Sequence, residues 1–89
     1  RTSETIILIV DDVPDNLRYL SCLLSQEGYD VRAAINGPTA LTIAQSVNPS
    51  LILLDILMPQ MDGYEVCRQL KLNPKTYEIP VIFLSALDD

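Results

Sequence analysis

The sequence predicts an α/β fold, a doubly wound parallel sheet, and three observations lead to that prediction. Apolar runs of four or five residues recur along the chain, at Ile6–Val10, 51–54 and Val81–Leu84. Continuous runs of this kind are typical of parallel strands that are buried on both faces. The stretches between them carry apolar residues at helical spacing, and the connections are short. The chain therefore alternates strands and helices within one unit.

The first predicted strand, Ile6–Val10, leads through Asp11 and Asp12 into a helix that begins at Pro14. Proline is favourable at the first helical position, because its missing N–H would be unpaired there anyway. Gly28 is the expected end of this helix. The residues expected to face the core recur at helical spacing: Val13, Leu17, Leu20 and Leu24.

A short second strand is predicted over residues 29–34, followed by a helix that opens at Gly37 and Pro38. Asn48 and Pro49 mark the end of this helix, because proline cannot continue it. Its apolar residues at helical spacing are Ala40, Leu41, Ala44 and Val47.

The third predicted strand, residues 51–54, is followed by Asp55 and a loop over residues 56–61. Asp62 with Glu65 three positions later has the pattern of a capping box, which predicts the start of a third helix. The apolar stripe of that helix is Val66, Cys67 and Leu70.

Asn73 and Pro74 end the third helix, and Pro80 leads into the fourth strand, Val81–Leu84. Because crossovers between parallel strands are right-handed, the third strand is expected beside the first, on the side opposite the second. The predicted order is therefore 2-1-3-4, as in flavodoxin-like sheets, with a switch point between strands one and three.

Composition limits the possible partners. The 89 residues carry twelve acidic and six basic side chains, a net charge of −6, which argues against a nucleic-acid or membrane-surface role. The one local basic cluster, Arg68, Lys71 and Lys75, is interpreted as a solvated helix face. The sequence contains neither an apolar run of membrane-spanning length nor a signal-peptide pattern. The start at Arg1 favours a piece of a longer protein.

The two cysteines, Cys22 and Cys67, are far apart, and the chain has no histidine, so a zinc site is not expected. We interpret both as small buried or half-buried apolar residues in a reducing, cytoplasmic environment.

Three carboxylates follow predicted strands that lie next to each other: Asp11, Asp12 and Asp55. Taken singly, Asp11 or Asp12 could be a helix cap. Together they meet at the carboxyl edge of the sheet, where their mutual repulsion calls for a cation. Hard oxygen ligands suit Mg²⁺, or Mn²⁺ in its place. Ser85 follows the fourth strand at the same edge.

Three motifs carry a family resemblance. They are Ile-Leu-Ile-Val-Asp-Asp at residues 7–12, Leu-Leu-Asp-Ile-Leu-Met-Pro-Gln-Met-Asp-Gly at 53–63, and Pro-Val-Ile-Phe-Leu-Ser-Ala at 80–86. With them the chain resembles the response-regulator receiver domain, the phosphoacceptor module of two-component signalling, over essentially all of its length.

The resemblance implies that Asp55 is the phosphoacceptor. Its carboxylate would attack the phosphorus of a donor, which is the phosphohistidine of a histidine kinase or histidine phosphotransfer domain, or a small molecule. Asp12, Asp55 and the backbone carbonyl of Leu57 would bind Mg²⁺, with Asp11 acting largely through water. The domain would be a signalling module that assists its own phosphorylation rather than an enzyme.

The resemblance also implies roles around this centre. Ser85 would be the switch hydroxyl that turns toward the phosphoryl group. Leu57 and Leu87 occupy positions that influence dephosphorylation, and two apolar residues there are expected to hinder attacking water. Three residues would shape the loop after the phosphoacceptor: Met58, Pro59 and Gly63.

Family members continue for roughly thirty more residues, toward the ordinary domain size. Those residues form a fourth helix, a fifth strand that ends in a lysine, and a fifth helix. Residues 1–89 are accordingly expected to be one incomplete receiver domain. Lys71 and Lys75 lie on the wrong side of the fourth strand to replace that lysine. The resemblance therefore does not decide whether residues 1–89 can be phosphorylated on their own. The apolar edge Val81–Leu84 predicts self-association, an exchange of elements between chains, or marginal folding.

Two alternative functions stand beside the phosphoacceptor. An interaction or oligomerisation module would keep the receiver fold without phosphoryl chemistry. A hydrolase of the aspartyl-phosphate type would need Asp-x-Asp after the first strand. Asp11 and Asp12 are adjacent, which argues against this alternative. A P-loop or dinucleotide site is excluded, because Gly28, Gly37 and Gly63 cannot form a glycine-rich loop.

Overall fold

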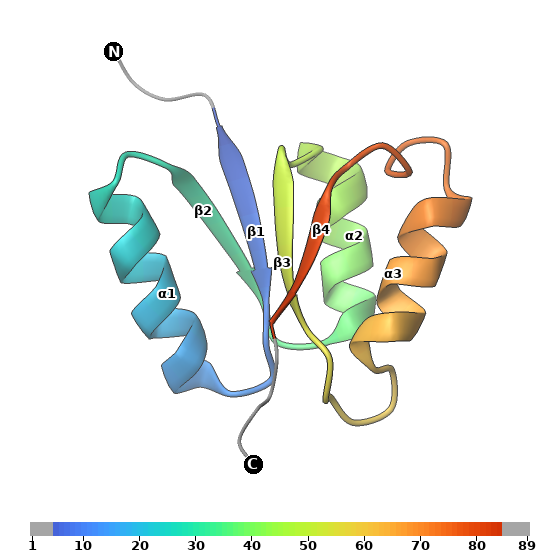
Figure 1. Cartoon of the computed structure of the whole chain (residues 1–89), viewed down its shortest axis with the longest axis horizontal. Helices are drawn as coiled ribbons and strands as arrows, with labels where there is room; N and C mark the ends of the chain where they lie inside the picture. Colours follow the sequence, from blue (N-terminus) through green and yellow to red (C-terminus); the bar gives the residue numbers. More distant parts are fainter. Residues whose placement is uncertain (1–4, 85–89) are drawn as a thin grey trace.

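The structure, a computed structural model, describes residues 5–84 and contains a parallel β-sheet flanked by helices (Figure 1). The sites predicted at Ser85 and Leu87 lie outside the described residues. The elements follow the predicted alternation: β1 (Ile6–Val10), α1 (Pro14–Gln26), β2 (Asp30–Ala34), α2 (Gly37–Val47), β3 (Leu51–Asp55), α3 (Gly63–Leu72) and β4 (Val81–Leu84).

The strand order is β2-β1-β3-β4, and all three pairings are parallel, which confirms the predicted topology. In register, Val10 of β1 lies beside Leu54 of β3, and Asp55 lies beside Leu84 of β4. The carboxyl ends of the two central strands therefore meet at one edge of the sheet. This edge is the switch point at which doubly wound sheets bind ligands.

The two faces of the sheet have separate cores, because alternate strand residues point to opposite faces. On one face, Leu8, Val10, Ile52 and Leu54 are fully buried beneath α2 and α3. On the other face, Ile7 and Ile9 pack with Leu17 of α1. Figure 1 shows α1 on one side of the sheet's strands and α2 with α3 on the other.

The face that carries α1 is only partly covered. α1 packs on β1 and β2, while the side chains of Leu51 and Leu53 on β3 remain half-buried. Ile82, which lies beside Leu53 in register, is 52% exposed. β4 is the last strand in the order of the described sheet. The expected exposed apolar edge is therefore present within residues 5–84.

The three helices start where the sequence predicts, but one residue expected to face the core does not. α1 begins at Pro14, and Gly28 follows its end with a φ of +96°, a conformation that favours glycine. Val13, however, is not part of the buried stripe. It occupies the extended N-cap position, where the helical periodicity does not yet apply, and is 44% exposed.

The capping prediction for α3 is half right. Asp62 accepts a hydrogen bond from the Glu65 main-chain N–H at 3.0 Å, as an N-cap should. The Glu65 side chain does not accept the second hydrogen bond of a capping box, from the Asp62 main-chain N–H. Arg68 and Gln69, one turn further along the helix, donate to it instead. α2 has a cap that the prediction lacked: Asn36, which accepts from the Thr39 N–H at 2.9 Å.

Two strand boundaries and one burial prediction need correction. β2 begins at Asp30 rather than Tyr29, and β3 extends through Asp55 because that residue pairs with Leu84. Cys22 is exposed on α1 rather than buried, whereas Cys67 is half-buried as expected.

The basic cluster is exposed as predicted, but one of its members has a structural role. The Lys71 ammonium group donates to the carbonyl oxygens of Tyr77 and Ile79, at 3.1 and 2.8 Å. It thereby fastens the α3–β4 connection to the end of α3. Within residues 5–84, no helix has the length and apolar character needed to cross a bilayer.

Candidate functional site

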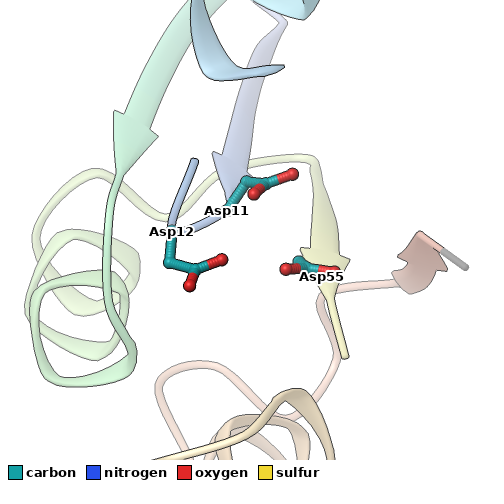
Figure 2. A group of neighbouring side chains, drawn as sticks. All are labelled: Asp11, Asp12 and Asp55. Carbon is teal, nitrogen blue, oxygen red and sulfur yellow. The ribbon is translucent and has the colours of Figure 1, made fainter. Parts of the chain in front are cut away.

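The three predicted acidic residues come together at the carboxyl edge of the two central strands. Asp11 and Asp12 directly follow β1, and Asp55 ends β3. Each residue offers a carboxylate oxygen, and these three atoms all lie within 4.8 Å of one another. Figure 2 shows the carboxylates of Asp12 and Asp55 turned toward each other across the end of the sheet.

Asp11 is held by donors from its own chain. Its Oδ1 atom accepts from the main-chain N–H of Val13 at 2.9 Å, and Oδ2 accepts from Nδ2 of Asn16 at 3.2 Å. The Asp11 N–H donates to the Ala34 carbonyl at the end of β2, at 3.1 Å. The N-cap position of α1 belongs to Val13, so neither Asp11 nor Asp12 is the cap residue.

Asn16 is a neighbour of the cluster that the sequence analysis missed. It lies in the first turn of α1, where side chains one turn into the helix reach back toward the preceding strand end. A useful signal would have been its spacing, five residues after Asp11 across a strand–helix turn. Asn16 is itself exposed, and an asparagine on the exposed side of a helix start gives no further signal in the sequence.

Asp55 is only 9% exposed and faces two other carboxylates. Burial raises the pKa of Asp55, and the negative charges of Asp11 and Asp12 raise it further. Main-chain N–H groups of Leu57 and Ile56 partly oppose this rise by hydrogen-bonding the charged form. Proximity to a bound cation would relieve the same repulsion.

The loop after Asp55 is closed tightly against the start of α3. The Gly63 N–H donates to the Ile56 carbonyl at 2.8 Å. A Cβ atom on Gly63 would lie 2.8 Å from the Ile56 Cα and would also meet the Asp55 carbonyl oxygen. Met58 is buried in the core beneath α2 and α3, whereas the Leu57 side chain is 66% exposed.

The donor set suits a divalent metal ion. Three carboxylates converge, and hard oxygen ligands of this kind favour small divalent cations over soft metals. Without a cation, three like charges within one small space would destabilise the ionised form of Asp55. The cluster is therefore compatible with a bound divalent metal.

A separate hollow of about 660 Å³ lies at the opposite, amino end of β3 and β4. Its lining comes from the turns that precede those strands, including Ser50, Lys75 and Pro80. The length of the strands separates this hollow from the acidic cluster, so it takes no part in the chemistry of that cluster.

Comparison with known proteins agrees with this architecture. Residues 7–89 match the family model of the response regulator receiver domain. Response regulator PleD of Caulobacter vibrioides is 51% identical over 82 residues, which cover 92% of this chain and 18% of PleD. The chain thus spans less than a fifth of that relative's length.

Two solved structures have the same fold. The N-terminal domain of a response regulator receiver protein from Methanoculleus marisnigri JR1 superimposes with a TM-score of 0.91 at 38% identity. That match covers 94% of this chain and 68% of the other. The receiver domain of sensor histidine kinase PA1611 from Pseudomonas aeruginosa, with magnesium coordinated in its active site cleft, gives a TM-score of 0.89 at 29% identity. There the match covers 96% of this chain and 70% of the other.

The family match begins in β1 and extends over every later element, and the similarity to PleD covers nearly the same residues. On that basis the chain belongs to the response regulator receiver domain family.

Proposed function

We propose that this chain is the phosphoacceptor of a two-component phosphorelay and that Asp55 is the residue phosphorylated. The position of Asp55 carries the proposal. It ends a central strand, is 9% exposed, and has a carboxylate oxygen within 4.8 Å of those of Asp11 and Asp12. One Asp55 oxygen attacks the phosphorus of a phosphohistidine. The P–N bond breaks, an acyl phosphate P–O bond forms, and the imidazole leaves with the bonding electrons and takes up a proton.

Asp12, Asp55 and the carbonyl oxygen of Leu57 would bind Mg²⁺ directly, and Asp11 would act mainly through a bound water. When bound, the ion offsets repulsion between the anionic nucleophile and the anionic donor and neutralises charge that develops during transfer. Magnesium in the cleft of the PA1611 receiver domain supports this assignment. Mn²⁺ would satisfy the same oxygen donors.

The expected donor is a histidine kinase or a histidine phosphotransfer domain in the cytoplasm. A receiver domain of a sensor histidine kinase is among the similar structures, which supports that class of partner. A net charge of −6 argues against a nucleic-acid partner. The organisation of residues 1–89 as one receiver domain, without the family's fourth helix, fifth strand and fifth helix, stays a prediction.

Two further roles complete the proposal. Ser85 is the switch residue that senses the phosphoryl oxygens through its hydroxyl group. Leu57 and Leu87 slow the loss of the phosphoryl group by hindering water. The Leu57 side chain is 66% exposed, two residues after Asp55, which supports a role for it in hindering water there.

The test is the intact mass of the 89-residue chain after incubation with Mg²⁺ and a small acyl phosphate donor. We expect the wild-type chain to gain one phosphoryl group and Asp55→Asn to gain none. Asp62→Asn is the matched control, because it removes a nearby carboxylate while asparagine still caps α3. Labelling of Asp55→Asn, or of no variant at all, would contradict the proposal.

An interaction or oligomerisation module is the second candidate function. Its supporting observation is the edge strand β4, where Ile82 is 52% exposed beside the half-buried Leu53. Such an edge can pair with another chain, either directly or by exchange of elements. Failure of Asp55 labelling together with concentration-dependent association would favour this function.

A further inference from the structure

Both carboxylate oxygens of Asp11 accept hydrogen bonds from α1 and the turn before it. The Val13 N–H donates to Oδ1 at 2.9 Å, and the Asn16 side-chain amide donates to Oδ2 at 3.2 Å. Asp11 is 5% exposed, which makes it the least exposed of the three acidic residues. A buried carboxylate with one donor on each oxygen cannot rotate without breaking a hydrogen bond.

The backbone places Asn16 for this contact. The N–H groups of Asn16 and Leu17 both donate to the Val13 carbonyl, at 3.0 and 3.2 Å, and thereby form the first turn of α1. Pro14 at the first helical position fixes where this turn begins. The Asn16 amide is therefore presented to Asp11 by a helix start rather than by a flexible loop.

The chemistry of the contact fits a carboxylate that must face a cation. An ionised carboxylate has about four lone-pair positions, so two remain after Val13 and Asn16 have donated. The neutral amide of Asn16 adds a donor without adding charge. It offsets part of the repulsion that would otherwise turn Asp11 away from Asp12 and Asp55. In metal sites, groups that hydrogen-bond a ligand in this way hold its orientation.

We propose that Asn16 is a positioning residue for the divalent cation, acting through its hydrogen bond to Asp11. The inference rests on the proposed function, because it assumes that Asp11 faces Mg²⁺. Loss of such a partner typically lowers metal affinity by about 10- to 100-fold. We expect the lower end for Asn16→Ala, about tenfold, because Val13 still holds the other oxygen and Asp11 acts through water.

The experiment is calorimetric titration of Mg²⁺ into the 89-residue chain, arranged as a double-mutant cycle of Asn16→Ala and Asp11→Asn. Alanine is the best helix former, so Asn16→Ala keeps α1 intact. Gln26→Ala is the matched control, because it removes an exposed amide from the far end of the same helix. Urea unfolding in metal-free buffer checks that each variant is folded.

The expected result is an affinity loss of about tenfold for Asn16→Ala in the wild-type background and none in the Asp11→Asn background. Gln26→Ala should bind Mg²⁺ as the wild type does. An equal loss in both backgrounds would mean that Asn16 acts through helix stability, and unchanged affinity would mean that it does not act; either result overturns the inference alone. Absence of Mg²⁺ binding by the wild type overturns the proposed metal site and this inference with it.

Discussion

Asp55 is buried beside two like-charged residues, Asp11 and Asp12, and this arrangement affects the stability of the fold as well as the chemistry of the site. Burial, Asp11 and Asp12 all raise the pKa of Asp55 above its ordinary value of 3.8. A carboxyl with a raised folded-state pKa binds more protons in the folded than in the unfolded chain. Its ionisation therefore destabilises the fold as the pH rises from 3.8 through the folded-state pKa.

We predict that Asp55→Asn raises the melting temperature of the metal-free chain at neutral pH, because the amide removes the buried charge. The gain should shrink as the pH falls below the folded-state pKa and vanish below 3.8, where Asp55 is protonated in both states. Circular dichroism melts across this pH range measure it. Asp15→Asn is the control, because Asp15 is exposed and paired with Arg18. A lower melting temperature for Asp55→Asn at neutral pH would contradict the argument.

Gly63 is constrained by the main chain of the loop that carries Asp55. A methyl group there would lie 2.8 Å from the Ile56 Cα and would meet the Asp55 carbonyl oxygen, so backbone atoms would have to move. We predict that Gly63→Ala lowers the free energy of unfolding by about 1–3 kcal/mol, the usual cost of overpacking. Urea unfolding measures this loss.

Gly37→Ala is the matched control for Gly63→Ala, since Gly37 is likewise the first residue of a helix. The added methyl group would meet the sulfur atom of Met61 and a methyl group of Val66. Because the Met61 side chain is flexible, we expect a smaller loss of stability than at Gly63. An equal or larger loss at Gly37 would argue against the backbone clash.

At the scale of elements, the α3–β4 connection depends on buried polar contacts. The Thr76 hydroxyl donates to the Leu70 carbonyl at 2.7 Å, and Thr76 is only 1% exposed. The same carbonyl, in the last turn of α3, also accepts from the N–H of the C-cap residue Asn73 at 3.3 Å, so the Thr76 hydroxyl is its second and closer donor. Together with Lys71, it fixes the path of the chain into β4.

We predict that Thr76→Val lowers the free energy of unfolding by about 0.5–1.5 kcal/mol, because valine has the same shape but leaves the Leu70 carbonyl with only the longer hydrogen bond from the Asn73 N–H, at 3.3 Å. Thr42→Val is the matched control, since the exposed Thr42 hydroxyl donates to the Pro38 carbonyl at 3.2 Å. Water can replace that bond, so the control should change stability by less than about 0.5 kcal/mol. Equal effects in urea unfolding would show that burial does not decide the cost.

The elements themselves could be predicted because their signals are local. A continuous apolar run predicts a buried strand, and Pro14 and Gly28 mark both ends of α1. The strand order followed from the handedness of crossovers. The convergence of Asp11 and Asp55 followed in turn, because each of them stands at the end of a central strand.

What could not be predicted depends on contacts that are distant in sequence or on a choice among equal partners. Asp55 joins β3 only because Leu84 pairs with it. Glu65 could have closed the capping box, but Arg68 offers a charged donor one turn away. The hydrogen bond of Asn16 to Asp11 needs the angle between β1 and α1, which the sequence alone does not give.

At the scale of the molecule, the sheet is covered unequally. α2 and α3 bury one face. On the other face α1 packs on β1 and β2, and no helix within residues 5–84 covers that face of β3 and β4. Leu51, Leu53 and Ile82 lie on this open area, next to the outer edge of β4. β4 has no further partner strand in the sheet that residues 5–84 form. An apolar surface beside such an edge favours pairing with a second copy of the chain.

We predict that the 89-residue chain associates reversibly with itself and that Ile82→Lys shifts it toward monomer, because a lysine ammonium group cannot be buried without a partner. Ile35→Lys is the matched control: Ile35 is 55% exposed, close to the 52% of Ile82, but lies in the turn between β2 and α2. Sedimentation velocity over a wide range of protein concentration measures the change. If the wild-type chain is monomeric throughout, or if both lysine variants dissociate it equally, the β4 edge is not the interface.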